Sequence, residues 1–81
     1  MTYKIVEVHW FDAQSSTEQL SAEDALKKLK PVITRSVGYL IPTKSDKYIL
    51  LAFTDFGKDR FKHWQVIPKG MIEGEIKVIR K

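Results

Sequence analysis

The stretch VITRSVGYLIPTKSDKYILLAFT, residues 32–54, decides the fold. Two runs of β-branched, aromatic and aliphatic residues flank the polar break Pro42 to Lys47, which is the pattern of two strands joined by a loop. The second run is apolar on both faces, with Ile49, Leu51 and Phe53 on one and Tyr48, Leu50 and Ala52 on the other. Strands of this kind lie in sheets that are covered on both sides. We therefore expect the central strands of a barrel or coiled sheet, covered on one side by a helix or a partner chain.

The first strand is predicted over residues 3–11, YKIVEVHWF. Apolar and polar residues alternate along it, so that Val6, Val8 and Trp10 share one face. We expect this face to enter the core.

A short helix is predicted from Ser21 to Lys30. Ser21 suits the N-cap position and two acids follow it in the first turn, whereas Pro31 ends the helix. Its apolar stripe consists of Ala22, Ala25, Leu26 and Leu29. Because a helix of about ten residues is marginal in isolation, we expect the stripe to pack on the barrel.

Residues 55–67, which follow the second central strand, are predicted to complete a hairpin with it. Residues 55–60 have the composition of a turn, with Gly57 available for a positive φ. Residues 61–67, FKHWQVI, form the next predicted strand. Trp64 alternates with apolar neighbours on that strand, so the leading interpretation places both Trp64 and Trp10 in the core.

We expect strand pairing to stop at residues 68–72, PKGMI, because proline lacks a backbone N–H donor and glycine permits a tight bend. A single helical turn here would place Met71 and Ile72 at one end of the barrel. The last strand is predicted over residues 75–79, with two inward residues, Ile76 and Val78.

These elements predict one domain, residues 1–81, in the order β-α-β-β-β-β. The class is mostly β with one helix. Five short strands fit a small, partly open β-barrel better than a flat sheet, whose edges would need protection. An α+β open antiparallel sheet is the alternative.

The net charge of +4 is concentrated in the C-terminal third. Residues 58–81 carry seven bases against three acids, whereas residues 1–30 carry four bases against five acids. A basic pole of this kind favours an anionic partner. The alternative is a solvated lysine surface without a ligand.

The composition argues against an enzyme, a disulfide framework and a membrane span. The chain has no cysteine, and no apolar run approaches the ~18 residues of a spanning helix. His9 and His63 are the only histidines, and no catalytic, phosphate-loop or metal-ligand motif accompanies them. We therefore expect no enzyme, no cofactor, no metal and no membrane partner.

The segment FGKDRFKHW, residues 56–64, is the most function-like part of the chain. Bases and aromatic residues alternate in it, as in grooves that hold single strands or nucleotides. The candidate ligand-binding residues are Lys58, Arg60, Lys62, His63, Lys69 and Phe56. A solvated turn between two strands would have a similar composition.

Arg35 interrupts the apolar strand from Val32 to Ile41. A charge at this place either protects a strand edge from aggregation or points inward to bind an anion. We favour the edge interpretation.

Four pieces of the chain, HWFDA (9–13), RSVGYLI (35–41), YILLA (48–52) and VIPKGMI (66–72), resemble a group of small uncharacterised proteins encoded by bacteriophages and prophages. The segment ending at Ile67-Pro68-Lys69 also resembles the end of an Sm-like barrel, or more broadly a Src-homology-like one. Sm-like proteins usually begin with a helix, whereas this chain begins with a strand. The resemblance implies a viral or mobile-element origin and carries no activity. Because no apolar run is long enough for a spanning helix, the expected location is the cytoplasm, here that of the host cell.

Three functions follow as hypotheses for a non-enzymatic accessory protein. The first is binding of nucleic acid or a nucleotide through the basic C-terminal third. The alternatives are an inhibitor that binds a host protein and a component of virion assembly. In each case we expect a homo-oligomer, because so short a chain leaves apolar strand faces uncovered.

Overall fold

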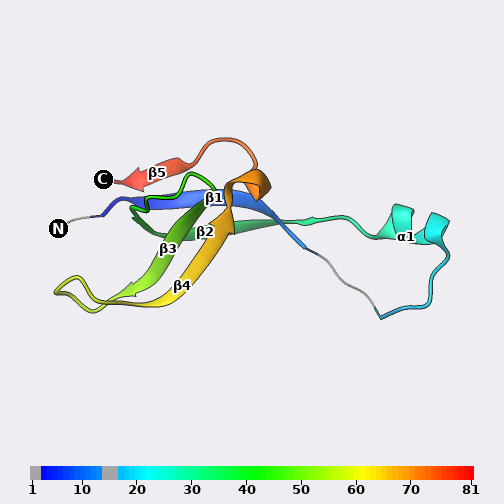
Figure 1. Ribbon diagram of the computed structural model, residues 1–81, viewed down its shortest axis with the longest axis horizontal. Coiled ribbons are helices and arrows are strands. Elements are labelled where there is room, and N and C mark those ends of the chain that lie inside the picture. Colours follow the sequence, from blue (N-terminus) through cyan, green and yellow to red (C-terminus); the bar gives the residue numbers. More distant parts are fainter. Residues whose placement is uncertain (1–2, 14–16) are drawn as a thin grey trace.

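The computed structural model describes residues 3–13 and 17–81, which form one antiparallel sheet with a short helix. The strands are β1 (Ile5–Asp12), β2 (Val32–Ile41), β3 (Tyr48–Asp55), β4 (Phe61–Pro68) and β5 (Lys77–Arg80), with helix α1 (Ala22–Lys28) and the 3₁₀ turn η1 (Lys69–Met71). The strand order is β4-β3-β2-β1-β5 and the sheet is not closed (Figure 1). The predicted mostly-β class and element order are confirmed.

The sheet consists of two long ribbons that share only a short overlap. β1 and β2 pair from Ile5↔Tyr39 to Asp12↔Val32, and β3 pairs with β4 along its whole length. β3 joins β2 only over residues 39–41. The segment of β2 from residue 32 to residue 37 therefore has a strand neighbour on one edge only.

After β4 the chain crosses to the other edge of β1. The turn η1 leads into a bridge between Ile72 and Trp10, and the backbone N–H of Glu73 donates to the carbonyl of His9 over 2.8 Å. The predicted helical turn is thus confirmed, and Ile72 packs against the core together with Ile76. Val78 is 47% exposed, so its predicted inward position is wrong; β5 is the edge strand beside β1, and all four of its residues are exposed.

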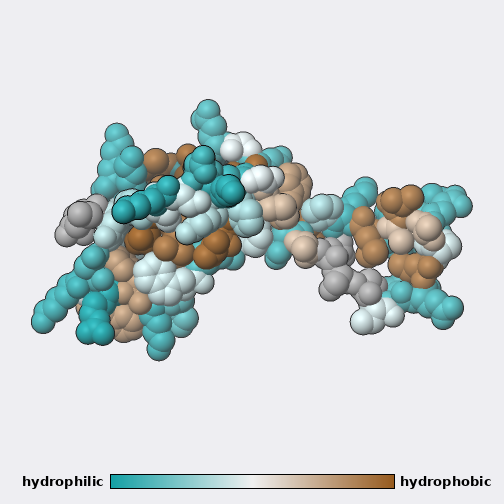
Figure 2. Space-filling model, viewed as in Figure 1, coloured by the Kyte–Doolittle hydropathy of each residue, from teal (hydrophilic) through white to brown (hydrophobic). Residues whose placement is uncertain are grey.

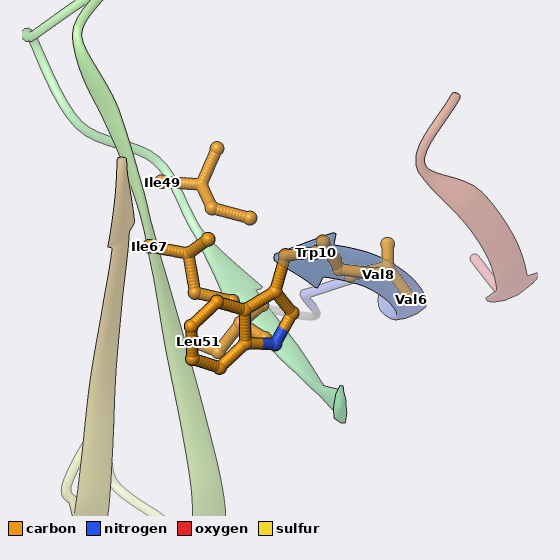
Figure 3. Close-up of a cluster of buried hydrophobic side chains, with 6 residues drawn as sticks. All are labelled: Val6, Val8, Trp10, Ile49, Leu51 and Ile67. Atoms are coloured by element: carbon orange, nitrogen blue, oxygen red, sulfur yellow. The ribbon is translucent and has the colours of Figure 1, made fainter. Parts of the chain in front are cut away.

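The core lies between the two ribbons. The predicted inward face of β1, Val6, Val8 and Trp10, is buried against three apolar residues of β3 and β4, Ile49, Leu51 and Ile67 (Figure 3). Burial of aliphatic side chains in such a cluster is the main favourable term in folding. The prediction for this face and for Trp10 is confirmed.

The inward residues of β2 are small or polar where the ribbons meet. Trp10 Nε1 donates a hydrogen bond to Ser36 Oγ over 3.0 Å, and the Ser36 hydroxyl donates to Gln65 Oε1 over 2.8 Å. Ser36 is buried. This chain of hydrogen bonds satisfies a buried indole N–H and links β1, β2 and β4.

Replacing Ser36 by Ala should lower the free energy of unfolding by about 1–3 kcal/mol, because the Trp10 N–H would stay buried without an acceptor. Urea denaturation followed by tryptophan fluorescence measures the change. Replacing Ser45, which lies in the loop before β3, by Ala is the matched control. An equal loss in both variants would contradict the network's role.

Helix α1 begins as predicted, with Ser21 as its N-cap; Ser21 Oγ accepts from the backbone N–H of Asp24 over 3.1 Å. The prediction that the helix packs on the sheet is wrong. None of its residues is buried, and Leu26 is 81% exposed. Figure 1 shows α1 at one end of the molecule, beyond the far tip of the β1–β2 ribbon.

The reason is the length of that ribbon. β1 and β2 stay paired as far as Asp12 and Val32, about 25 Å from the start of β1 at ~3.3 Å a residue. The β3–β4 ribbon covers only the part of the β1–β2 ribbon that lies toward the β2–β3 overlap. A helix at the far tip therefore has no sheet beneath it, and the molecule extends over 52 × 23 × 22 Å.

Candidate nucleic-acid interface

The β3–β4 loop is a tight hairpin turn. The backbone N–H of Phe56 donates to the carbonyl of Arg60 over 2.9 Å, and that of Arg60 to the carbonyl of Gly57 over 3.1 Å. Lys58 and Asp59 have φ angles of 53° and 59°, the sign that type I′ hairpin turns require at both central residues. Lys58 is thereby held at the exposed tip.

A tyrosine from the start of the chain fastens this turn to the sheet. The Tyr3 hydroxyl donates to Asp59 Oδ1 over 2.7 Å. This hydrogen bond, together with partial desolvation and the charge of the carboxylate, raises the pKa of Tyr3 above its ordinary value, because ionisation would remove the donor and place two anions side by side.

Phe61 is the centre of an aromatic cluster. Its ring centroid lies 5.5 Å from that of Tyr3, 5.7 Å from that of Tyr39 and 5.9 Å from that of Trp64. The Tyr3 and Trp64 rings meet Phe61 nearly edge to face, a favourable arrangement for aromatic pairs. The cluster holds Phe61 in place at the base of the hairpin.

Beside Phe61 is a shallow hollow of about 420 Å³, open to solvent and lined by Phe56, Arg60, Phe61 and Lys62. The Phe56 side chain is 64% exposed. Trp64 is 50% exposed, so its predicted place in the core is wrong. It pairs with Ala52 of β3, on the side of the ribbon opposite the core cluster residues Leu51 and Ile67. Aromatic surface is therefore available next to two cations.

The three bases of the hairpin, Lys58, Arg60 and Lys62, are exposed and form no ion pair with any residue in the described ranges. Two acids lie in the same loop. Asp55 accepts from the backbone N–H of Gly57 over 2.7 Å, and Asp59 accepts from Tyr3. The acids thus hold the turn, and the three bases extend from it without a carboxylate partner among the described residues.

The structure brings five of the six predicted residues into one hairpin and separates the sixth. His63 has a φ of 63° in the middle of β4, and its Nδ1 lies 3.0 Å from Thr54 Oγ1. Lys69 follows the far end of β4, about 23 Å along the strand, where its backbone N–H donates to the carbonyl of Lys47.

Tyr3 and Tyr39 belong to the site but were not predicted. In the sequence, Tyr39 shares one face of its predicted strand with Ile33 and Val37, and nothing there indicates contact with Phe61. Tyr3 lies 56 positions from the Asp59 it binds. Only the pairing of the strands brings these segments together.

A second group of charges lies on β1 and its neighbours. Glu7 Oε2 is 2.6 Å from His9 Nε2. This hydrogen bond lowers the pKa of Glu7, aided by the positive charges of Lys77 and Arg35. Arg35 is exposed on the part of β2 that lacks a β3 neighbour, so it lies at a strand edge and does not point inward. Within the described ranges no three His, Asp or Glu side chains are grouped to hold a metal ion.

No protein-family model, no curated protein and no solved structure matches this chain. Among the described residues, no helix is both long and apolar enough to cross a membrane. The hairpin itself combines exposed rings with unpaired cations, which is an arrangement suited to binding an anion that also carries a flat ring.

Proposed function

We propose that this protein binds single-stranded nucleic acid through the basic–aromatic hairpin, residues 55–64. The observation that carries the proposal is the open hollow in which Phe56 and Phe61 lie beside Arg60 and Lys62. Bases stack on exposed aromatic rings whatever their sequence, and cations follow the phosphates between them. We propose no catalytic step and no cofactor.

A strand fits the hollow better than a free nucleotide or a duplex. Sites for small ligands enclose most of the ligand surface, whereas this hollow is shallow and open. In a duplex the faces of the bases are stacked on each other and cannot reach a ring. The expected order of affinity is therefore single strand first, with duplexes and nucleotides weaker.

The proposed roles divide among the residues by chemistry. Lys58, Arg60 and Lys62 contact phosphates, and Phe56 and Trp64 stack on bases. Phe61 is a positioning residue, because its ring contacts Tyr3, Tyr39 and Trp64 and is partly buried.

The binding test titrates fluorescent single-stranded oligonucleotides at two salt concentrations. In the variant Lys58→Ala, Arg60→Ala, Lys62→Ala, the slope of log K against log salt should flatten by about 2, because each phosphate contact on a single strand contributes ~0.7. Lys69→Ala, the matched control for charge, should leave the slope nearly unchanged. Trp64→Ala should weaken binding by about 1–3 kcal/mol without changing the slope.

Two outcomes would overturn the proposal. One is a wild type that binds no single strand below ~100 μM at low salt, where non-specific phosphate binding should already be visible. The other is a Lys69→Ala effect as large as that of the triple variant, which would indicate diffuse attraction to the whole basic third. Circular dichroism confirms that each variant is folded.

A second candidate function is that of a phage or mobile-element accessory protein that inhibits a host protein in the host cytoplasm. Its phage origin is supported by the sequence resemblance alone. The structural observation in its favour is the edge strand β4, whose Val66 side chain is 57% exposed. A complex captured from nuclease-treated lysate that withstands raised salt would favour it over nucleic-acid binding.

A further inference from the structure

We propose that two copies of this chain associate through the arm, residues 17–37, which comprises α1, its flanking residues and the free edge of β2. The two arms lie antiparallel about a two-fold axis, each covering the other. The proposal is independent of nucleic-acid binding, because it uses the opposite end of the molecule from the basic–aromatic hairpin (Figure 1).

The single chain is elongated. Its radius of gyration is 16.0 Å, against about 12 Å for a compact domain of this length. The accessible surface is 6522 Å², against about 5,000 Å² for a compact monomer of 9.4 kDa. The excess, about 1,500 Å², is larger than the ~800 Å² that each partner buries in a standard interface.

The arm exposes several large apolar side chains. Leu26 is 81% exposed, Val32 50%, Ile33 55% and Val37 48%. Figure 2 shows hydrophobic side chains gathered at the α1 end of the molecule. A helix of seven residues with no buried side chain is too short to be stable in water without a partner surface. A second copy supplies that surface.

The arm also contains a free strand edge. Within the described ranges, β2 is paired with β1 alone from residue 32 to residue 37, and a free edge of this kind can pair with a strand of another chain. An identical edge running antiparallel fits it, and an isologous contact needs such self-complementarity. Like charges directly opposite each other are unfavourable, so the register that sets Arg35 against its own copy is disfavoured.

The charge distribution favours contact between the arms of two copies over contact between their more basic bodies. Residues 17–37 carry three acids and four bases, a net charge of +1, so repulsion between two copies of the arm is small. The C-terminal third of each copy carries the net +4. Overlap of the arms keeps the two basic hairpins at opposite ends of the dimer (Figure 1).

The test is sedimentation velocity on the full chain from 1 to 100 μM. The wild type should sediment as a dimer within this range. The variant Leu26→Glu, Val37→Glu should dissociate at least tenfold more readily, because it places charges in the contact while leaving the core untouched. Phe56→Glu, a matched control at an equally apolar exposed site of the hairpin, should remain a dimer.

Disulfide trapping gives a second readout, because the chain has no cysteine of its own. Ile33→Cys, near the expected axis, should cross-link to a covalent dimer on mild oxidation, whereas Phe56→Cys should not. A wild type that stays monomeric at 100 μM overturns the proposal. So does a dimer that survives Leu26→Glu, Val37→Glu or that cross-links through Phe56→Cys in preference to Ile33→Cys.

Discussion

Replacing Leu51 by Ala will lower the free energy of unfolding by about 2–5 kcal/mol, whereas replacing Leu26 by Ala will change it by less than about 0.5 kcal/mol. The two substitutions remove the same atoms. Leu51 has no exposed surface and belongs to the core cluster between the ribbons, but Leu26 is 81% exposed. Loss of the Leu51 side chain leaves a cavity that the surrounding strands cannot fill.

Urea denaturation at several submicromolar concentrations measures both changes, because a change that does not vary with concentration belongs to folding of the single chain and not to association. The Leu26 variant is the matched control. A loss of several kcal/mol in that variant at such dilution would show that α1 packs against the sheet of its own chain. The placement of the arm would then be wrong, and with it the expected dimer.

Replacing Gly38 by Ala will destabilise the fold by about 1–3 kcal/mol or more, the range expected for overpacking. A Cβ at this position would lie 2.9 Å from the carbonyl oxygen of Ala52 and 3.1 Å from the ring of Phe53. The oxygen belongs to the backbone of the neighbouring strand, so it cannot turn aside as a flexible side chain can. The β2–β3 overlap would have to open.

Gly70→Ala is the control for this effect, because nothing lies within 4 Å of the added Cβ and the residue has no positive φ. It should be neutral, or stabilising by up to about 1 kcal/mol through the lower entropy of the unfolded chain. Thermal and urea denaturation compare the two variants. Equal stability of the Gly38 and Gly70 variants would contradict the close approach of β2 and β3.

The two proposals assign different tasks to the two ends of one elongated molecule. The basic–aromatic hairpin closes one end, and the arm extends from the other (Figure 1). A dimer formed through the arms presents two hairpins that face away from each other. Variants in the hairpin should therefore leave the dissociation constant of the dimer unchanged, and variants in the arm should leave the affinity of each hairpin for a single strand unchanged. Each proposal can thus be tested alone.

The sequence by itself determined the local elements. Alternating apolar residues mark the strands, Ser21 with its following acids marks the start of the helix, and Gly57 marks the hairpin turn. Pro68 with Gly70 marks the break that becomes η1. Each of these features depends on interactions within a few residues, so a window of sequence contains the information. The basic–aromatic composition of the hairpin is readable in the same way.

Only the tertiary structure decided which apolar residues are covered. Trp10 and Trp64 both occur in alternating strands, but Trp10 faces the space between the ribbons and Trp64 faces outward. The difference depends on how the ribbons coil across each other, which no local pattern records. The same holds for Val78, whose strand lies at an uncovered edge.

The positions of the helix and of the binding residues were decided in the same way. The stripe of α1 has the pattern of a packed helix, yet the continued pairing of β1 with β2 carries it beyond the sheet. Lys69 shares the basic third with Lys58, but a full strand separates them in space, while Tyr3 comes from the far end of the chain to bind Asp59. Contacts between distant segments depend on strand order, register and crossing, and these are properties of the whole fold.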